Sequence, residues 1–323
     1  MDLSDCTLCP RNCHANRLSA AHATDTQSVP LGYCGQTNEI KAARAALHMW
    51  EEPCLSGQTG SGTVFFSGCN MRCVFCQNHP ISAGSKGKPL SVSRLSEIFL
   101  ELQNKQACNI NLVTPTHFVP QIIQALDTAK SRGLTIPVVY NTGSYEKTET
   151  LKMLEGLVDI YLPDLKYISS ALSRKYSYAE DYFRYAGDAI AEMVRQTGTP
   201  AFFPQESDGT SCLPQSNDEP LMKKGVIVRH LALPGCMEDS KAILRYLYDT
   251  YKNDIYVSIM NQYTPLPQFL DIKTFPELNR TVAPQEYEEL VDYALSIGIE
   301  NGYIQEGGTC SESFIPDFDC FGL

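Results

Sequence analysis

Three cysteines with the spacing CxxxCxxC provide the clearest chemical signal in this sequence. They are Cys69, Cys73 and Cys76, and they follow directly on a strand-like run at 63–66. Thiolates are the usual ligands of iron–sulfur clusters, and three of them leave one iron of a four-iron cube without a protein ligand. An open iron can bind the amine and carboxylate of another molecule. The spacing therefore predicts a redox centre that takes a cofactor.

Two other sites use the same kind of ligand, namely a zinc knuckle and an ordinary ferredoxin cluster. A zinc knuckle needs a fourth ligand, and His79 lies only three residues beyond Cys76. However, zinc ribbons use paired CxxC motifs, which differ from the CxxxCxxC spacing found here. We therefore favour three thiolates and an open iron over these two alternatives.

Composition limits the partners and the location of the protein. The chain has 323 residues, a net charge of −11 and 13 cysteines. An acidic chain without a run of lysine or arginine is not expected to bind nucleic acid through its phosphates. No stretch approaches about 18 consecutive apolar residues, so we expect no membrane span. The many cysteines, without a basic and apolar leader, favour metal thiolates in a reducing cytoplasm.

Hydrophobic patterns after the cysteine loop alternate between short β-rich runs and amphipathic helices, which is typical of a parallel sheet. Helical spacing occurs at 95–102, 120–133, 244–251 and 284–298. We predict an α/β fold, specifically a partial (β/α)6 TIM-like barrel at 56–323 with a small cysteine-rich, metal-binding extension at 1–55. A doubly wound flat sheet is the alternative. The predicted strands are 63–66, 110–114, 136–140, 158–162, 226–230, 255–259 and 303–305.

Six segments, one of them the cysteine loop itself, together carry a resemblance to a known group. They are 6–13, 32–35, 68–78, 164–166, 229–235 and 260–263. Together they resemble the radical SAM proteins related to pyruvate formate-lyase activating enzyme, in the branch with an amino-terminal cysteine cluster. The likeness extends over nearly the whole chain, and the cysteine loop is its most specific part.

The resemblance implies a [4Fe–4S] cluster on Cys69, Cys73 and Cys76 that cleaves S-adenosylmethionine (SAM) to a 5′-deoxyadenosyl radical. It also implies an electron donor such as flavodoxin or ferredoxin, and hydrogen abstraction from a protein or peptide, as in glycyl-radical activases. Within that class a small-molecule substrate stays open. The implied cofactor contacts are Phe75, Gln77, Thr114, Asn141, Ser144, Asp164, Lys166 and Arg229.

The chain departs from the activating enzymes at one point. Those enzymes carry Gly-Gly-Glu after the second barrel strand, where it binds the amino group of the cofactor. Here the matching position is Thr114-Pro115-Thr116-His117, which contains no carboxylate. The neutral acceptors Thr114, Thr116 and His117 are the candidates to replace it. This difference and the extra cysteines weaken the specific expectation of glycyl-radical activation.

A second group of four cysteines lies near the amino terminus. Cys6, Cys9, Cys13 and Cys34 could close a structural zinc site or hold an auxiliary iron–sulfur cluster. The sequence does not choose between them. An iron–sulfur scaffold or electron-transfer protein that does not cleave SAM is the alternative to the enzyme. A reactive thiol at Cys212 or Cys310 is a further hypothesis.

Overall fold

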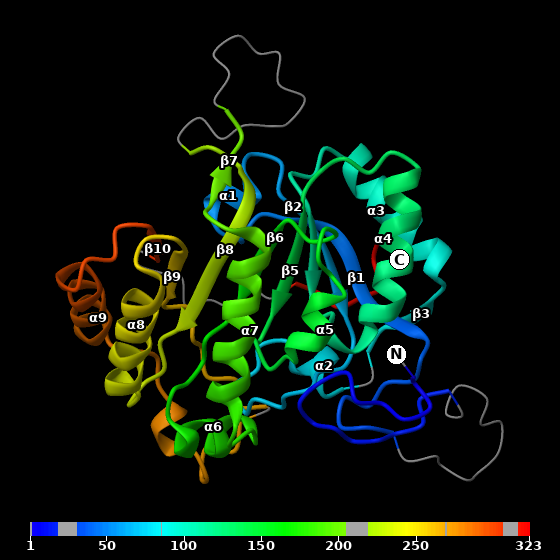
Figure 1. Ribbon diagram of the computed structural model, residues 1–323. Coiled ribbons are helices and arrows are strands. Elements are labelled where there is room, and N and C mark those ends of the chain that lie inside the picture. Colours follow the sequence, from blue (N-terminus) through cyan, green and yellow to red (C-terminus); the bar gives the residue numbers. More distant parts are fainter. Residues whose placement is uncertain (1, 19–30, 85, 205–218, 269, 306–315) are drawn as a thin grey trace.

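The computed structural model describes residues 2–18, 31–84, 86–204, 219–268, 270–305 and 316–323. Within these ranges the strands form a single mixed sheet (Figure 1). The strands are β1 (Ile40–His48), β2 (Ser61–Phe66), β3 (Lys88–Leu90), β4 (Ile110–Val113), β5 (Val138–Thr142), β6 (Ile160–Pro163), β7 (Ala201–Phe202), β8 (Met222–Leu231), β9 (Tyr256–Met260) and β10 (Gly302–Ile304).

The sheet has a long parallel part and a short antiparallel edge. Its order is β10-β9-β8-β6-β5-β4-β2-β1-β3, and β7 pairs with β8. The seven neighbouring strands β10, β9, β8, β6, β5, β4 and β2 pair parallel to one another. Strand β1 pairs antiparallel with both β2 and β3. Because parallel strands end at one edge, the loops that follow them converge there.

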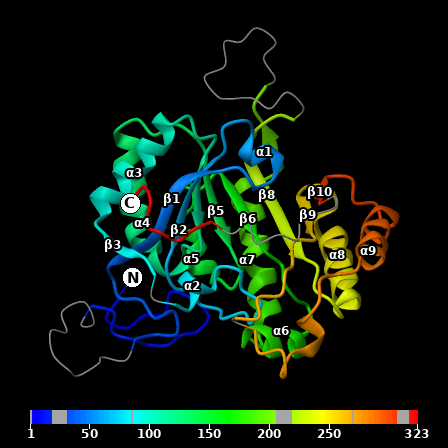
Figure 2. The ribbon, with the colours of Figure 1, turned by 180° about the vertical axis from the view of Figure 1, so that it is seen from behind.

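Helices cover one face of the sheet. In Figure 1, α3, α4 and α7 lie in front of the strands, and Figure 2 shows the opposite face. None of the helices in the described ranges is long and apolar enough to cross a membrane. The helices are α1 (Pro53–Ser56), α2 (His79–Ser82), α3 (Val92–Asn104), α4 (Val119–Ser131), α5 (Thr148–Lys152), α6 (Ser170–Ser177), α7 (Tyr182–Thr197), α8 (Met237–Tyr251) and α9 (Pro284–Ser296), with 3₁₀ turns η2 (Thr116–Phe118) and η3 (Pro276–Leu278).

The predicted α/β fold with a partial parallel barrel is confirmed, and the flat doubly wound sheet is not found. Every residue of β4, β5 and β6 is buried, as expected for central parallel strands with both faces covered. All seven predicted strands are present, with ends shifted by a few residues.

One long strand, β1, is absent from the predicted set. Its sequence, IKAARAALH, is rich in residues that favour helices. Pairing with β2 and burial of Ala42, Ala43 and Ala45 outweigh that local preference. The strand lies inside the predicted extension at 1–55, while its partner belongs to the predicted barrel at 56–323. The boundary between these two parts stays a prediction.

The last eight residues (316–323, the C-terminal segment) cross the strands on the face seen in Figure 2. They are bonded to β1, because Cys320 N–H donates to the Ala43 carbonyl and Ala45 N–H donates to the Phe321 carbonyl, both at 2.9 Å. The Phe318 ring packs edge-on against Phe65 of β2 at 5.6 Å between centroids. The segment thereby covers part of the barrel interior.

Candidate functional site

The cysteine loop leaves β2 through a turn that requires glycine. Gly68 has φ of 87°, and a Cβ there would lie 2.5 Å from Gln36 Cγ and 2.7 Å from the Cys34 carbonyl oxygen. The Gly68 N–H donates to the Ile81 carbonyl at 2.8 Å, which closes the loop onto α2. Only a residue without a side chain lets the amino-terminal extension approach the loop this closely.

Each of the three loop thiols has its own hydrogen-bond partner. The Met71 N–H donates to Cys69 Sγ at 3.3 Å, and the Ser177 hydroxyl donates to Cys73 Sγ at 3.0 Å. Cys76 Sγ lies 3.3 Å from Ser82 Oγ. Burial raises the pKa of all three thiols, that of Cys76 to about 11. Donors aimed at sulfur are the environment that tunes cluster-bound cysteines.

The three loop thiols share one cavity. Across the described residues, no three Cys, His, Asp or Glu side chains stand close enough to hold one metal ion. A four-iron cube binds each cysteine through a different iron, so its ligands lie farther apart than those of one zinc ion. The three thiols nevertheless line one cavity. This shared cavity is where a [4Fe–4S] cluster could be held.

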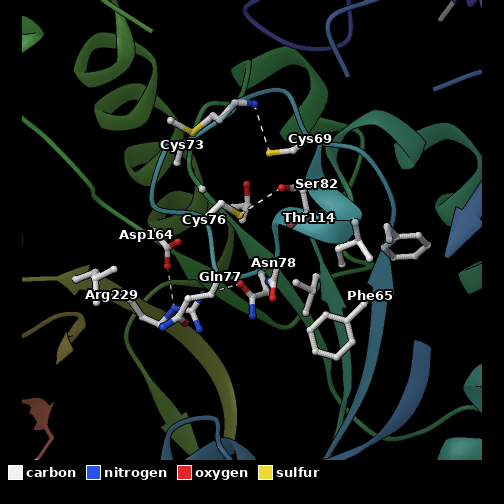
Figure 3. A pocket seen from close by; sticks show the side chains of 18 of the residues that line it. Phe65, Cys69, Cys73, Cys76, Gln77, Asn78, Ser82, Thr114, Asp164 and Arg229 are labelled. Carbon is white, nitrogen blue, oxygen red and sulfur yellow. Dashed lines mark hydrogen bonds and ion pairs between the residues drawn. The ribbon is translucent and has the colours of Figure 1, made fainter. Parts of the chain in front are cut away.

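A network of charged side chains lines another part of the same cavity (Figure 3). Arg229 donates through Nε to Asp164 at 2.9 Å, through one Nη to Glu51 at 3.2 Å and through the other to Asn141 at 2.7 Å. Lys166 Nζ donates to the second oxygen of Asp164 at 2.6 Å. All three guanidinium nitrogens of Arg229 therefore have protein acceptors.

Burial and neighbouring charges act in opposite directions on these carboxyl groups. Burial acts to raise the pKa of Asp164, but Arg229 and Lys166 hold it below its usual value. Burial raises the pKa of Glu51, and Arg229 opposes that shift only in part. Asp164 is thus the firmly ionised member of the network, and Glu51 is the carboxyl group that would accept a proton first.

Most of the predicted cofactor contacts meet in this cavity. Phe75, Gln77, Thr114, Asn141, Asp164, Lys166 and Arg229 all line it with the three cysteines. Gln77 is fixed by donating to the Gln262 carbonyl at 2.9 Å, and the Phe75 ring packs edge-on against Tyr167 and Tyr263. Ser144 is the exception, because it is fully buried behind the cavity wall and is absent from its lining.

A buried carboxyl group, Glu146, lies behind the wall next to Ser144. Its Oε1 accepts hydrogen bonds from the hydroxyls of Thr116 and Thr142, each at 2.6 Å, and from Tyr140 at 3.3 Å. Its Oε2 is buried and has no hydrogen-bond partner within the described ranges. Burial raises the pKa of Glu146 to about 7. Thr116 and Thr142 also line the cavity, so they connect it to the carboxyl group.

The four amino-terminal cysteines lie outside this cavity. Burial raises the pKa of Cys9 to about 12, with contributions from Cys34 and Cys6, and raises that of Cys34, with contributions from Cys6 and Cys13. The four thiols are therefore neighbours. They do not converge on a point that suits one metal ion. A zinc ion or an auxiliary cluster at this quartet stays a prediction.

Arg11 joins the extension to the cysteine loop. It donates to the carbonyls of Asn70 at 2.7 Å, Tyr178 at 2.6 Å and Ser177 at 3.4 Å. Its guanidinium lies 3.8 Å from the centre of the Tyr33 ring, and that of Arg72 lies 4.5 Å from the same ring. These cation–π contacts place the quartet's neighbouring residues directly on the loop that carries Cys73.

Four residues of the site have no place in the predicted set: Glu51, Ser82, Glu146 and Ser177. Ser177 lies 104 positions after Cys73 and comes from the end of α6, so no local pattern links the two. The one available signal was the order of Ser144 and Glu146 after a predicted strand end. Cys212 and Cys310 lie outside the described residues.

Fold and site together define an α/β protein that presents three thiols of one loop inside a partial parallel barrel, beside a buried charge network. A protein-family model described as "Radical SAM superfamily" matches residues 63–221. That stretch contains all three thiols, Asp164 and Lys166. Residues 63–221, just under half of the chain, are therefore similar to the radical SAM superfamily.

Other comparisons give similar proteins. Uncharacterized protein MJ0674 of Methanocaldococcus jannaschii is 26% identical over 300 residues, which cover 90% of this chain and 74% of that protein. SuiB of Streptococcus suis, solved with S-adenosylmethionine, gives a TM-score of 0.49 and 11% identity over 74% of this chain and 48% of that chain. The FeFe-hydrogenase maturase HydG of Carboxydothermus hydrogenoformans gives a TM-score of 0.45 and 12% identity, over 79% of this chain and 60% of that chain. The chain thus spans about half of the first solved structure and three fifths of the second.

Proposed function

We propose that this protein is a radical SAM enzyme that holds a [4Fe–4S] cluster through Cys69, Cys73 and Cys76 and cleaves SAM reductively. The observation that supports this most is the set of three thiols, each with its own hydrogen-bond partner, lining one cavity with Asp164 and Lys166. When bound, the reduced cluster would supply an electron to the sulfonium, giving methionine and a 5′-deoxyadenosyl radical that abstracts hydrogen.

The cavity residues suit the parts of SAM in different ways. The Phe75 ring is largely buried and lines the cavity, where it offers an apolar surface for the adenine. Asn141, Asp164 and Lys166 offer the hydrogen-bonding groups for the ribose and methionine ends. Arg229 is fully engaged with protein acceptors, so we assign it to positioning Asp164 and Asn141 and not to direct recognition of a carboxylate.

We propose a protein or peptide as the substrate, in the manner of enzymes related to pyruvate formate-lyase activating enzyme. The resemblance of the motifs supports this assignment. An electron donor such as flavodoxin or ferredoxin would supply the electron. The abundance of cysteine supports a reducing, cytoplasmic setting for this chemistry.

An iron–sulfur scaffold or electron-transfer protein is the second candidate. The amino-terminal quartet favours it, because Arg11 connects that group of thiols to the loop of Cys73. In either case we propose a zinc ion or a second cluster at Cys6, Cys9, Cys13 and Cys34. A scaffold would bind iron but would not produce 5′-deoxyadenosine.

The test is anaerobic reconstitution followed by iron, sulfide and zinc analysis and a 5′-deoxyadenosine assay with SAM and dithionite. The variants are the triple replacement of Cys69, Cys73 and Cys76 by alanine, the triple replacement of Cys6, Cys9 and Cys13 by alanine, and Cys108→Ala. Cys108 is the matched control, because it is buried against Ser56 and Thr59 away from both groups.

We expect the first triple variant to lose about four irons and all SAM cleavage, and Cys108→Ala to keep both. Metal lost selectively from the second triple variant would identify the content of the quartet. Iron retained by the first triple variant, or wild-type protein that never cleaves SAM, would exclude the enzyme and favour the scaffold.

A further inference from the structure

Two threonine hydroxyls in the cavity wall are oriented by the carboxyl group behind them. Thr116 and Thr142 line the cavity and both donate their hydroxyl hydrogens to Glu146 Oε1 at 2.6 Å. A hydroxyl has one hydrogen and two lone pairs. Once its hydrogen is donated to Glu146, the hydroxyl can only accept a hydrogen bond from a group in the cavity. The Ser144 N–H donates to Thr142 Oγ1 at 3.2 Å, which leaves one lone pair of that oxygen for another donor.

Glu146 is built into the wall and not exposed to solvent. It is 1% exposed, Thr116 is 1% exposed and Thr142 is 4% exposed. Its second oxygen has no partner in the part of the chain that the structure describes, although buried carboxylate oxygens are normally satisfied. This cluster therefore has unused capacity to accept hydrogen bonds and to stabilise positive charge.

We propose that Thr116 and Thr142, backed by Glu146, bind an ammonium group of a ligand in this cavity. The inference rests on the proposed function, and it assigns the group as the amino group of SAM. An ammonium donates hydrogen bonds and carries the charge that a buried carboxylate lacks. A carboxylate or phosphate would find neither a donor nor a cation at these two hydroxyls.

The neighbouring cation makes the assignment more specific. Lys166 lies close to Gly143, because a Cβ at Gly143 would be 3.4 Å from Lys166 Cε. Gly143 follows Thr142 directly, so a cation and the accepting hydroxyls lie side by side in the wall. An amino acid, which carries ammonium and carboxylate on the same carbon, matches this pair of opposite preferences. Residues 114–117 contain no carboxylate, and in this proposal Glu146, behind the cavity wall, provides the negative charge instead.

The test compares two ligands on cluster-loaded protein under anaerobic conditions without reductant. One ligand is SAM, and the other is the analogue with hydrogen in place of the amino group, each measured by equilibrium dialysis. Glu146→Gln should weaken the binding of SAM on the order of 10-fold or more, because it removes the buried negative charge that stabilises the ammonium behind the two hydroxyls. Binding of the analogue should change less than about threefold by the same reasoning.

Further variants separate recognition from folding. Thr116→Val should weaken SAM selectively, whereas Thr116→Ser, which keeps the hydroxyl, should restore the preference for the amino group. Glu192→Gln is the matched control, because Glu192 is buried on α7 and bonded to Arg195, outside the cavity. Cluster content is measured for every variant, so that a loss of iron is not taken for a loss of ligand contact.

Three results would overturn the inference. Equal losses for SAM and the analogue would show that Glu146 only supports the fold. Unchanged affinities would show that the wall serves no SAM amino group, including the case in which it binds an amine of the substrate. Wild-type protein that binds neither ligand would overturn the proposed function, and the inference with it.

Discussion

Glu146 shows how one residue can link stability to the chemistry of a site. A carboxyl group that is 1% exposed loses its hydration, and three hydroxyls on one oxygen replace only part of it. Its pKa of about 7 follows from burial. The protein therefore tolerates an unfavourable group where a ligand would benefit from it, as is common at functional sites.

The titration of Glu146 gives a prediction with a definite sign. Its pKa rises from 4.5 when unfolded to about 7 when folded. Between these values the folded state binds the extra proton, so the contribution of Glu146 to stability falls as pH rises from about 4.5 to about 7. The fall amounts to about 3 kcal/mol. Glu146→Gln should remove this dependence, so the variant should gain on wild type between pH 5 and pH 8.

Urea unfolding at several pH values, on wild type and variant side by side, measures this difference. Glu192→Gln is the control, because the hydrogen bond from Arg195 lowers the pKa of Glu192, which is the opposite direction to the shift of Glu146. The difference in the free energy of unfolding between Glu192→Gln and wild type should stay constant between pH 5 and pH 8. A Glu146→Gln difference that is equally flat would show that Glu146 is ionised throughout.

At the scale of elements, the C-terminal segment is a wall of the barrel interior. Phe318 is 7% exposed and packs with Ala43, Phe65, Ile81 and Val113, whereas Phe321 is 56% exposed. Phe318→Ala should lower the free energy of unfolding by about 3–5 kcal/mol, as for other buried phenylalanines. Phe321→Ala should change it by less than about 1 kcal/mol.

Denaturant unfolding of the two variants tests this difference. Equal effects would mean that the segment adds little to the packing of β1 and β2. A large effect of Phe321→Ala would instead point to its contact with Arg44, whose guanidinium lies 5.3 Å from the Phe321 ring.

The sequence predicts the elements whose own hydrophobic pattern determines their secondary structure. The parallel strands and α3, α4 and α9 follow their hydrophobic periods, and their positions were predicted to within a few residues, whereas α8 begins seven residues before the predicted pattern at 244–251. β1 was missed because its helix-favouring sequence becomes a strand only through its pairing with β2. Glu51 and Ser177 were missed because they reach the cavity by packing of segments distant in sequence.

At the scale of the molecule, the predicted boundary at residue 55 can be compared with a boundary before β1. A chain that begins at residue 36 keeps β1, whereas one that begins at residue 56 exposes the bonding edge of β2 and the part of the core that Ala42 and Ala45 cover. We expect the first to unfold cooperatively and the second to aggregate, because uncovered edges pair with other chains.

Light scattering and thermal unfolding of the two shortened chains measure the outcome. If the chain that begins at 56 is monomeric and unfolds cooperatively, the barrel is independent from residue 56 onwards. If both chains aggregate, residues 1–35 contribute to the fold through the contacts of Arg11 and Arg17.

Before β1, several cations join the extension to the rest of the chain by binding main-chain carbonyls. Arg11 binds those of Asn70, Ser177 and Tyr178, Arg17 binds those of Thr37 and His117, and Lys147 binds that of Thr7. Every residue type offers the same carbonyl. During divergence, the partner positions are therefore free to change their side chains without loosening the contact, while the three cations are not.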